Sequence, residues 1–245
     1  MTNDNSSSRR HLAGPRQQHN HTRHTIQALL QYRELNQDFV DWCLRNHLQI
    51  NAGKTKELMV DFRKRRLLPP TLVNIQGKDI EMVTSCKYLS VHLNNKLDWT
   101  DHITALYRKG QSRLYLLRRL RSFGVQGALL KTFFDTVVAS AIFYGVVCWG
   151  SSVSAADRKR LDKLIKKASS VLGCSLDSVQ VVGERRMTAK LSSLRTNDSH
   201  PLQEEIKALE SSFSDRLIHP KCVKERYRRS FLPAAVRLHN QHCSQ

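Results

Sequence analysis

The fold follows most directly from residues 101–123, which read DHITALYRKGQSRLYLLRRLRSF. Leu106, Leu114, Leu117 and Leu120 fall on one face at helical spacing, and arginines occupy much of the remaining circumference. This pattern is typical of an amphipathic helix that buries one side and exposes the other. The sequence therefore predicts a long helix with one apolar face and one basic face.

Further helices are expected toward the C-terminus. Residues 128–149 form an apolar run that stops at Gly150, and residues 155–172 carry a second leucine-rich stripe opposite a lysine-rich side. Beyond Gly173 the periodicity weakens, which indicates short helices around 187–194 and 203–209 and a basic tail around 221–240.

The N-terminal side has a mixed pattern. Residues 25–47 have helical spacing, whereas 57–62, 72–75 and 88–93 are short apolar runs bounded by proline, glycine or asparagine, as in a small antiparallel sheet. Residues 1–24 are polar throughout, and we expect them to be disordered and to contain no secretory signal.

These patterns predict an α+β fold in four parts. The expected parts are a disordered leader (1–24), an α+β segment with a small sheet and a flanking helix (25–100), a helical bundle (101–175), and short helices with a basic tail (176–245).

The charge balance points to a polyanionic partner. The chain has 40 Lys and Arg against 21 Asp and Glu, a net charge of +19. Such an excess favours RNA or DNA over a membrane, because the sequence shows no basic amphipathic helix with aromatic anchors and no apolar run long enough for a span. We expect binding through the backbone, without base readout.

Three basic segments are the candidate contact sites. Basic side chains on a single helix usually just solvate it, but here the pattern recurs in three places with few balancing acids. The candidate nucleic-acid-binding residues are Arg113, Arg118, Arg119, Arg121, Lys159, Lys163, Lys166, Lys167, Arg226, Arg228 and Arg229.

Other chemical motifs are weaker. The six cysteines stand singly, as expected of reduced, mainly buried thiols in an intracellular protein, and the set Cys222, His239, His242 and Cys243 lacks the paired spacing of a zinc site. The segment 51–55 (NAGKT) ends like a phosphate-binding loop but lacks its first glycine, so a turn between helix and strand is favoured. No metal site is predicted.

Several short signatures occur in an order that resembles LINE-type (non-LTR) retrotransposon reverse transcriptases. The resemblance covers roughly residues 38–240, and each signature alone is weak, so the shared order carries it. The signatures are Trp42 and Cys43 before the LQINAGKTKE of 48–57, the KYLSV of 87–91, Leu97 with Trp99 and His102, the basic 113–125, Tyr144 and Gly145 before Trp149, HPL at 200–202, and the SFLPAAVRLHN of 230–240.

Two departures from that family bear on activity. Ser90 stands where the family usually has glycine, and no YxDD hairpin is present: the acids before Asn51 are Asp4, Glu34, Asp38 and Asp41, none of them paired. Because polymerases hold two metals with paired aspartates, the resemblance implies no catalytic residue and no polymerase activity for this segment alone. The intact polymerase would use magnesium, whereas no cofactor is expected here.

The same resemblance implies roles for the remaining parts. Residues 25–100 would be the end of a polymerase palm, with Lys54 near the nucleotide phosphates, and the helices after Trp99 would form a thumb that grips template and primer. An intact retrotransposon protein is a further candidate partner.

The segment around 109–144 also resembles the N-terminal module of the alkylated DNA repair protein AlkB homologue eight. That name implies a second hypothesis, 2-oxoglutarate- and iron-dependent oxygenation or methyl transfer to a tRNA wobble uridine. The chain has no His-x-Asp/Glu pair for iron and no glycine-rich turn for a methyl donor.

A third hypothesis is a genomic relic that does not fold stably, because palm strands without their neighbours leave open sheet edges. The sequence indicates an intracellular protein and leaves two readings of its compartment. The RKRR of 63–66 suits a nuclear import signal and equally a loop before Pro69.

Overall fold

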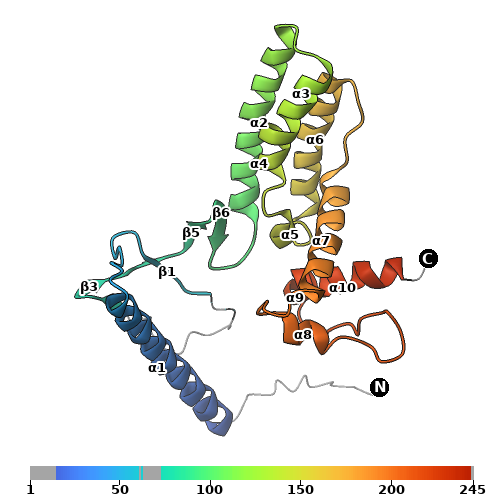
Figure 1. Ribbon diagram of the computed structural model, residues 1–245. Helices are drawn as coiled ribbons and strands as arrows, with labels where there is room; N and C mark the ends of the chain where they lie inside the picture. Colours follow the sequence, from blue (N-terminus) through green and yellow to red (C-terminus); the bar gives the residue numbers. More distant parts are fainter. Residues whose placement is uncertain (1–14, 61, 63–72, 244–245) are drawn as a thin grey trace, which may run out of the picture. The chain divides into compact units, whose positions relative to one another are not determined.

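The computed structural model describes residues 15–60, 62 and 73–243 (Figure 1). The chain divides into two compact units, residues 1–86, here called the N-terminal unit, and residues 87–245, here called the helical unit. The helices and the short strand pairs together confirm the predicted α+β class.

In the N-terminal unit, α1 (Pro15–Arg45) is the dominant element. Proline suits the first position of a helix, where the missing N–H is not needed, and His47 ends the helix in a left-handed conformation with φ 54°. Helix α1 thus begins inside the predicted leader (1–24), and residues 1–14 lie outside the described part of the chain.

The strands that the structure describes in this unit are shorter than predicted, and they form two separate two-stranded pairs. β1 (Lys56–Leu58) pairs in parallel with β4 (Glu81–Val83), whereas β2 (Asn74–Ile75) and β3 (Lys78–Asp79) form a separate antiparallel hairpin. The core of the unit is small, with Val40, Ile75 and Ile80 as its buried cluster.

The strand pair β5 (Ser85–Tyr88) and β6 (Val91–Asn94) leads into the helical unit. Leu89 and Ser90 connect the two strands, and both have positive φ, 44° and 67°. Two consecutive left-handed residues are the mark of a type I′ turn, which favours glycine at the second position. Ser90 takes this second position, where the resemblance stated above implies glycine.

The longest helices of the helical unit are α2 (Thr100–Ser122), α6 (Ala155–Leu172) and α7 (Val179–Arg195). The first two confirm the predictions for 101–123 and 155–172. Helix α6 begins at an N-cap, where Ser154 Oγ accepts a hydrogen bond from the Asp157 N–H at 3.1 Å, and it ends at Gly173 in a left-handed conformation.

The predicted single helix over 128–149 is right for its first part and wrong for its end. The chain is helical without a gap through α3 (Gly127–Phe133), the π-helical segment η1 (Phe134–Ala139) and α4 (Ser140–Ile142), and residues 143–145 then separate this helix from α5 (Val146–Trp149). Gly145, with φ 61°, turns the chain before α5 and places Trp149 in the core with no exposed surface.

The C-terminal region is more ordered than the predicted basic tail. After α8 (Gln203–Lys207) and α9 (Glu225–Arg228), α10 (Phe231–His242) buries Ala234, Ala235 and Val236. The helix is stabilised because its consecutive apolar residues pack against other helices of the unit.

The core of the helical unit consists of two apolar clusters joined by α7. The larger lies among α2 to α6, which stand side by side in Figure 1, and includes Val179 and Val182 from the start of α7. The smaller packs the later part of α7 against α8 and α10, with Leu191, Leu194 and Ile206 buried. The long α7 therefore fixes the two ends of the unit to one another.

Candidate nucleic-acid interface

The candidate interface is built on two helices, α2 and α6, that run in parallel. Near their beginnings, the Arg160 guanidinium lies 4.0 Å from the ring centroid of Tyr107. Near their ends, the Arg121 guanidinium donates a hydrogen bond to the Val171 carbonyl. Between these contacts the helices come very close at Gly110, where an added Cβ would stand 2.8 Å from Leu164 Cδ1.

Two of the predicted binding arginines serve the packing of this unit. The Arg121 guanidinium donates a hydrogen bond to the Val171 carbonyl in the last turn of α6. Carbonyls in the last turn of a helix have no N–H partner within that helix, so Arg121 satisfies one of them. Arg113 donates to the Val137 carbonyl in η1 and is only partly exposed. Both side chains therefore hold backbone in place and have fewer donors left for a ligand.

The predicted lysines of α6 are all exposed. Lys159, Lys163, Lys166 and Lys167 follow one another at helical spacing, so they share the outer side of α6 over about 12 Å. In the described part of the chain, none of these four has an acidic partner within 4.0 Å.

The acids of α6 do not neutralise these lysines because they bind backbone and cap groups elsewhere. Asp157 accepts from the Ser154 hydroxyl at 2.8 Å, and Asp162 accepts from the Val179 N–H at 2.9 Å. The Asp157 carboxylate thus lies at the beginning of α6 and the Asp162 carboxylate at the beginning of α7, and a negative charge is favourable at both places. Among the described residues, the lysine side of α6 therefore forms no ion pair with the acids of its own helix.

Arg118 of α2 extends this positive surface across the seam. Residues 107 and 121 of α2 contact residues 160 and 171 of α6, so helical spacing places Arg118 on the α6 side of α2 and Lys167 at the edge of the outer side of α6 that is next to α2. Arg118 and Lys167 therefore lie at similar heights. We call the surface formed by Arg118, Lys159, Arg160, Lys163, Lys166 and Lys167 the α2–α6 basic face.

The remaining predicted arginines lie off this face or are paired. Arg119 is exposed at the end of α2, 5.0 Å from the centroid of the Phe123 ring. Arg228 and Arg229 both form ion pairs with Glu225, the latter at 2.7 Å. The hydrogen bond from Arg229 lowers the pKa of Glu225. Arg226 is exposed and lines a pocket described below.

Lys54 lies in a turn between α1 and β1, as the sequence predicted for the segment 51–55. Its backbone N–H donates to Asn51 Oδ1 at 3.0 Å, and its side chain is exposed. The turn precedes a strand, whereas a phosphate-binding loop would open a helix. Lys54 belongs to the N-terminal unit, whereas α2 and α6 belong to the helical unit.

Metal binding finds no support among the described residues, where no three His, Cys, Asp or Glu side chains gather closely enough to hold an ion. Cys243 Sγ lies 3.7 Å from His239 Nε2, while the His239 ring also contacts the Asp215 carbonyl.

Of the six thiols only Cys43 is buried, so the expectation of mainly buried cysteines is wrong.

His102 is a buried polar residue that sequence reasoning did not single out as a chemical site. Its ring lies between those of Trp99 and Trp149, with centroids 6.0 and 5.8 Å away. Its Nδ1 accepts from the His92 N–H at 3.3 Å, and its Nε2 has no hydrogen-bond partner among the residues that the structure describes. Burial is the main cause that lowers the pKa of His102 to about 4, so the ring is neutral at pH 7.

None of the described helices is both long and apolar enough to cross a membrane.

Comparison with known proteins gives two similarities. The family described as "Alkylated DNA repair protein alkB homolog 8, N-terminal" matches residues 99–138, which comprise α2, α3 and most of η1. The Drosophila melanogaster protein named "Probable RNA-directed DNA polymerase from transposon BS" is 25% identical over 180 residues. No solved structure matches the chain.

The polymerase similarity covers 72% of this chain but only 18% of the relative, so the chain spans less than a fifth of that protein. The family match covers a short helical segment that includes one half of the α2–α6 seam. The chain is therefore distantly similar, over most of its length, to part of a transposon RNA-directed DNA polymerase.

Proposed function

We propose that the helical unit binds the sugar–phosphate backbone of RNA or DNA without sequence preference, as a segment derived from a LINE-type reverse transcriptase. The observation that carries the proposal is the α2–α6 basic face, with its four unpaired lysines on one side of α6. Lysines on a rigid helix make point contacts with phosphates and read no base edges.

The spacing of the face supports contact with a duplex. Lys159 to Lys167 cover about 12 Å along α6, and a duplex carries about one phosphate charge per 1.7 Å of its axis.

Both proteins named in the comparisons bear names of nucleic-acid enzymes, a transposon RNA-directed DNA polymerase and a DNA repair protein. In this proposal the segment performs no polymerisation by itself, because the sequence contains no YxDD hairpin.

The test is the salt dependence of binding. Fluorescence anisotropy of a labelled blunt RNA:DNA hybrid, titrated with the full chain at several salt concentrations, gives the slope of log affinity against log salt. With about six phosphate contacts the slope should be roughly minus five, because each contact contributes about 0.9. Binding that does not change with salt would contradict the proposal.

A pair of charge-matched variants locates the contacts. In the first, Lys159, Lys163, Lys166 and Lys167 are all changed to glutamine. In the second, the same change is made at Arg185, Lys190, Lys207 and Lys221, four exposed cations outside the face. The first variant should flatten the slope by about three to four, whereas the second should alter it by less than about one. Equal effects would show that only the net charge matters and that the face is not a binding site.

A further inference from the structure

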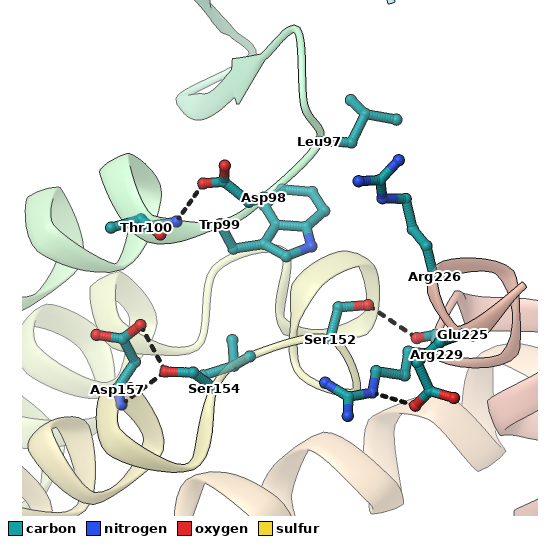
Figure 2. Close-up of a pocket in the computed structure, with 11 residues that line it drawn as sticks. Leu97, Asp98, Trp99, Thr100, Ser152, Ser154, Asp157, Glu225, Arg226 and Arg229 are labelled. Atoms are coloured by element: carbon teal, nitrogen blue, oxygen red, sulfur yellow. Dashed lines mark hydrogen bonds and ion pairs between the residues drawn. The ribbon is translucent and has the colours of Figure 1, made fainter. Parts of the chain in front are cut away.

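A pocket of about 300 Å³ lies at the N-terminal end of α6, away from the outer side of that helix. Three segments that are distant in sequence form it: residues 97–100 at the start of α2, residues 152–157 at the start of α6, and Glu225, Arg226 and Arg229 of the α9 region. Figure 2 shows the Trp99 indole between Asp98 and Ser152, with the Arg226 guanidinium extended toward Leu97.

The walls of the pocket combine a flat apolar surface with hydrogen-bonding groups. Trp99, Leu97 and Val153 supply the apolar part. Asp98 and Asp157 supply carboxylate acceptors at opposite sides, and Arg226 supplies a donor. An indole face next to acceptors and a guanidinium is suited to a planar heterocycle that both stacks and forms hydrogen bonds at its edge.

Most of the lining groups are held in place by the fold. Ser154 and Asp157 cap α6, and Ser152 Oγ donates to the Arg229 carbonyl at 2.8 Å. The Asp98 carboxylate accepts from the Asn94 amide at 3.1 Å and from the Thr100 N–H at 3.3 Å. The Asn94 hydrogen bond is the largest cause that lowers the pKa of Asp98, so this carboxylate is an ionised acceptor at neutral pH. The shape of the pocket is therefore set before any ligand binds.

The charge of the lining argues against a phosphate as the occupant. Two arginines face three carboxylates, and Glu225 is already paired with Arg229. A neutral ring with an amino group fits better, because a carboxylate can accept hydrogen bonds from that amino group at no cost in charge repulsion. The volume suits one heterocycle and excludes a duplex.

We propose that this pocket takes one unpaired nucleobase of a strand whose backbone lies on the α2–α6 basic face, with the amino-bearing bases adenine, cytosine and guanine favoured over uracil and thymine. This inference rests on the proposed function. Both sites use the first turns of α6: Asp157 lines the pocket, and Lys159, two residues later and therefore on another side of the helix, is the first lysine of the face. An unpaired end of a few nucleotides would pass around the first turn of α6 from one site to the other.

The experiment compares two hybrids by anisotropy with the full chain: the blunt RNA:DNA hybrid and the same hybrid with a three-nucleotide single-stranded adenine overhang. The overhang should tighten binding about five- to tenfold at a fixed salt concentration, as expected of one stacked base. A thymine overhang should give a smaller gain. Equal affinity for blunt and adenine-overhang hybrids would overturn the inference.

Variants assign the gain to the pocket. Trp99→Leu should abolish the overhang gain and leave the affinity and salt slope for the blunt hybrid unchanged, whereas Trp99→Phe, which keeps a ring, should retain part of the gain. Trp42→Leu, in the N-terminal unit, is the matched control and should change neither. Since Trp99 also contacts His102, a circular dichroism melt of each variant accompanies the titrations.

A second route avoids altering Trp99. Thr100 lines the pocket and is exposed, so Thr100→Trp should partly fill it and remove the overhang gain in a folded protein. If Thr100→Trp keeps the full gain, the base binds elsewhere and the inference fails. If the blunt hybrid itself shows no salt-dependent binding, the proposed function fails, and the two failures are thus distinguishable.

Discussion

At the residue scale, His102 joins the β5–β6 hairpin to the helices. Its buried ring accepts the His92 N–H of β6 and packs against Trp99 at the start of α2 and Trp149 at the end of α5. Besides burial, the charges of His92 and Lys109 also lower its pKa. The folded structure therefore favours the neutral form of the ring over the protonated form.

This arrangement predicts how stability depends on pH. An unfolded histidine takes up a proton near pH 6.5, whereas folded His102 does so only near pH 4. Between these values the unfolded state binds more protons, so the contribution of His102 to the free energy of unfolding should fall as pH falls from 6.5 toward 4, by roughly 3 kcal/mol in total, and this contribution should then level off. Urea denaturation at a series of pH values measures this change.

The matched control is His102→Phe, which keeps an aromatic ring and removes the titration. The variant should lose most of the pH dependence between 6.5 and 4, and the difference between the two profiles isolates His102 from the other histidines. NMR titration of the His102 ring gives its pKa directly. A measured value near 6.5, or the same profile in both proteins, would show the ring to be hydrated and the prediction wrong.

At the element scale, the α2–α6 seam depends on one missing side chain. Gly110 is buried within α2, and an added Cβ would meet Leu164 at 2.8 Å and Ile142 at 3.4 Å. Leu164 is itself nearly fully buried, so it has little room to move. A branched side chain at this position would push the two helices apart and disturb the basic face that they share.

We therefore expect Gly110→Val to lower the free energy of unfolding by about 2 kcal/mol, since overpacking a core commonly costs about 1–3 kcal/mol and helix propensity recovers only part of it. Chemical denaturation monitored by circular dichroism measures the change. Ser112→Val, at an exposed position of the same helix, should change stability by less than about 0.5 kcal/mol. If both substitutions had the same small effect, the close approach of α2 and α6 would be in doubt.

The elements also show which parts of the fold the sequence could predict. Helices α2 and α6 have regular apolar spacing and clear ends, and they lie within one residue of the predicted bounds. Helix α7 was predicted far too short, because its first turns contain valines and Gly183, which have low helix propensity. Burial of Val179 and Val182 in the larger core overrides that local preference.

The break in 128–149 was not predictable for a related reason. Apolar spacing alone cannot show that Gly145 adopts a positive φ or that η1 widens the helix, because both depend on packing against the rest of the unit. The contacts of the candidate site could be predicted from the sequence only in part, for the same reason. Periodicity placed the α6 lysines on an exposed side, but it could not show that Arg113 and Arg121 reach backbone carbonyls of other segments.

At the scale of the whole molecule, the two units differ greatly in what they bury. The apolar cluster of the N-terminal unit consists of Val40, Ile75 and Ile80, whereas the helical unit has two clusters joined by α7. Several large apolar side chains of α1 are exposed, among them Leu35, Phe39 and Trp42, whose exposed fractions are 67%, 55% and 49%. Because burial of apolar surface is the main stabilising contribution, the N-terminal unit should be much the less stable of the two.

Limited proteolysis tests this difference and also the hypothesis of a relic that does not fold. Trypsin has many sites in so basic a chain, and those in the N-terminal unit should be cut first, because local opening there requires little free energy. We expect a resistant fragment that begins between residues 79 and 97 and retains α2 to α10, identified by intact mass and N-terminal sequencing. Its urea transition should coincide with the main transition of the full chain. Uniform digestion without a resistant fragment would instead favour the relic, since even the larger core would then fail to protect α2, α6 and α7.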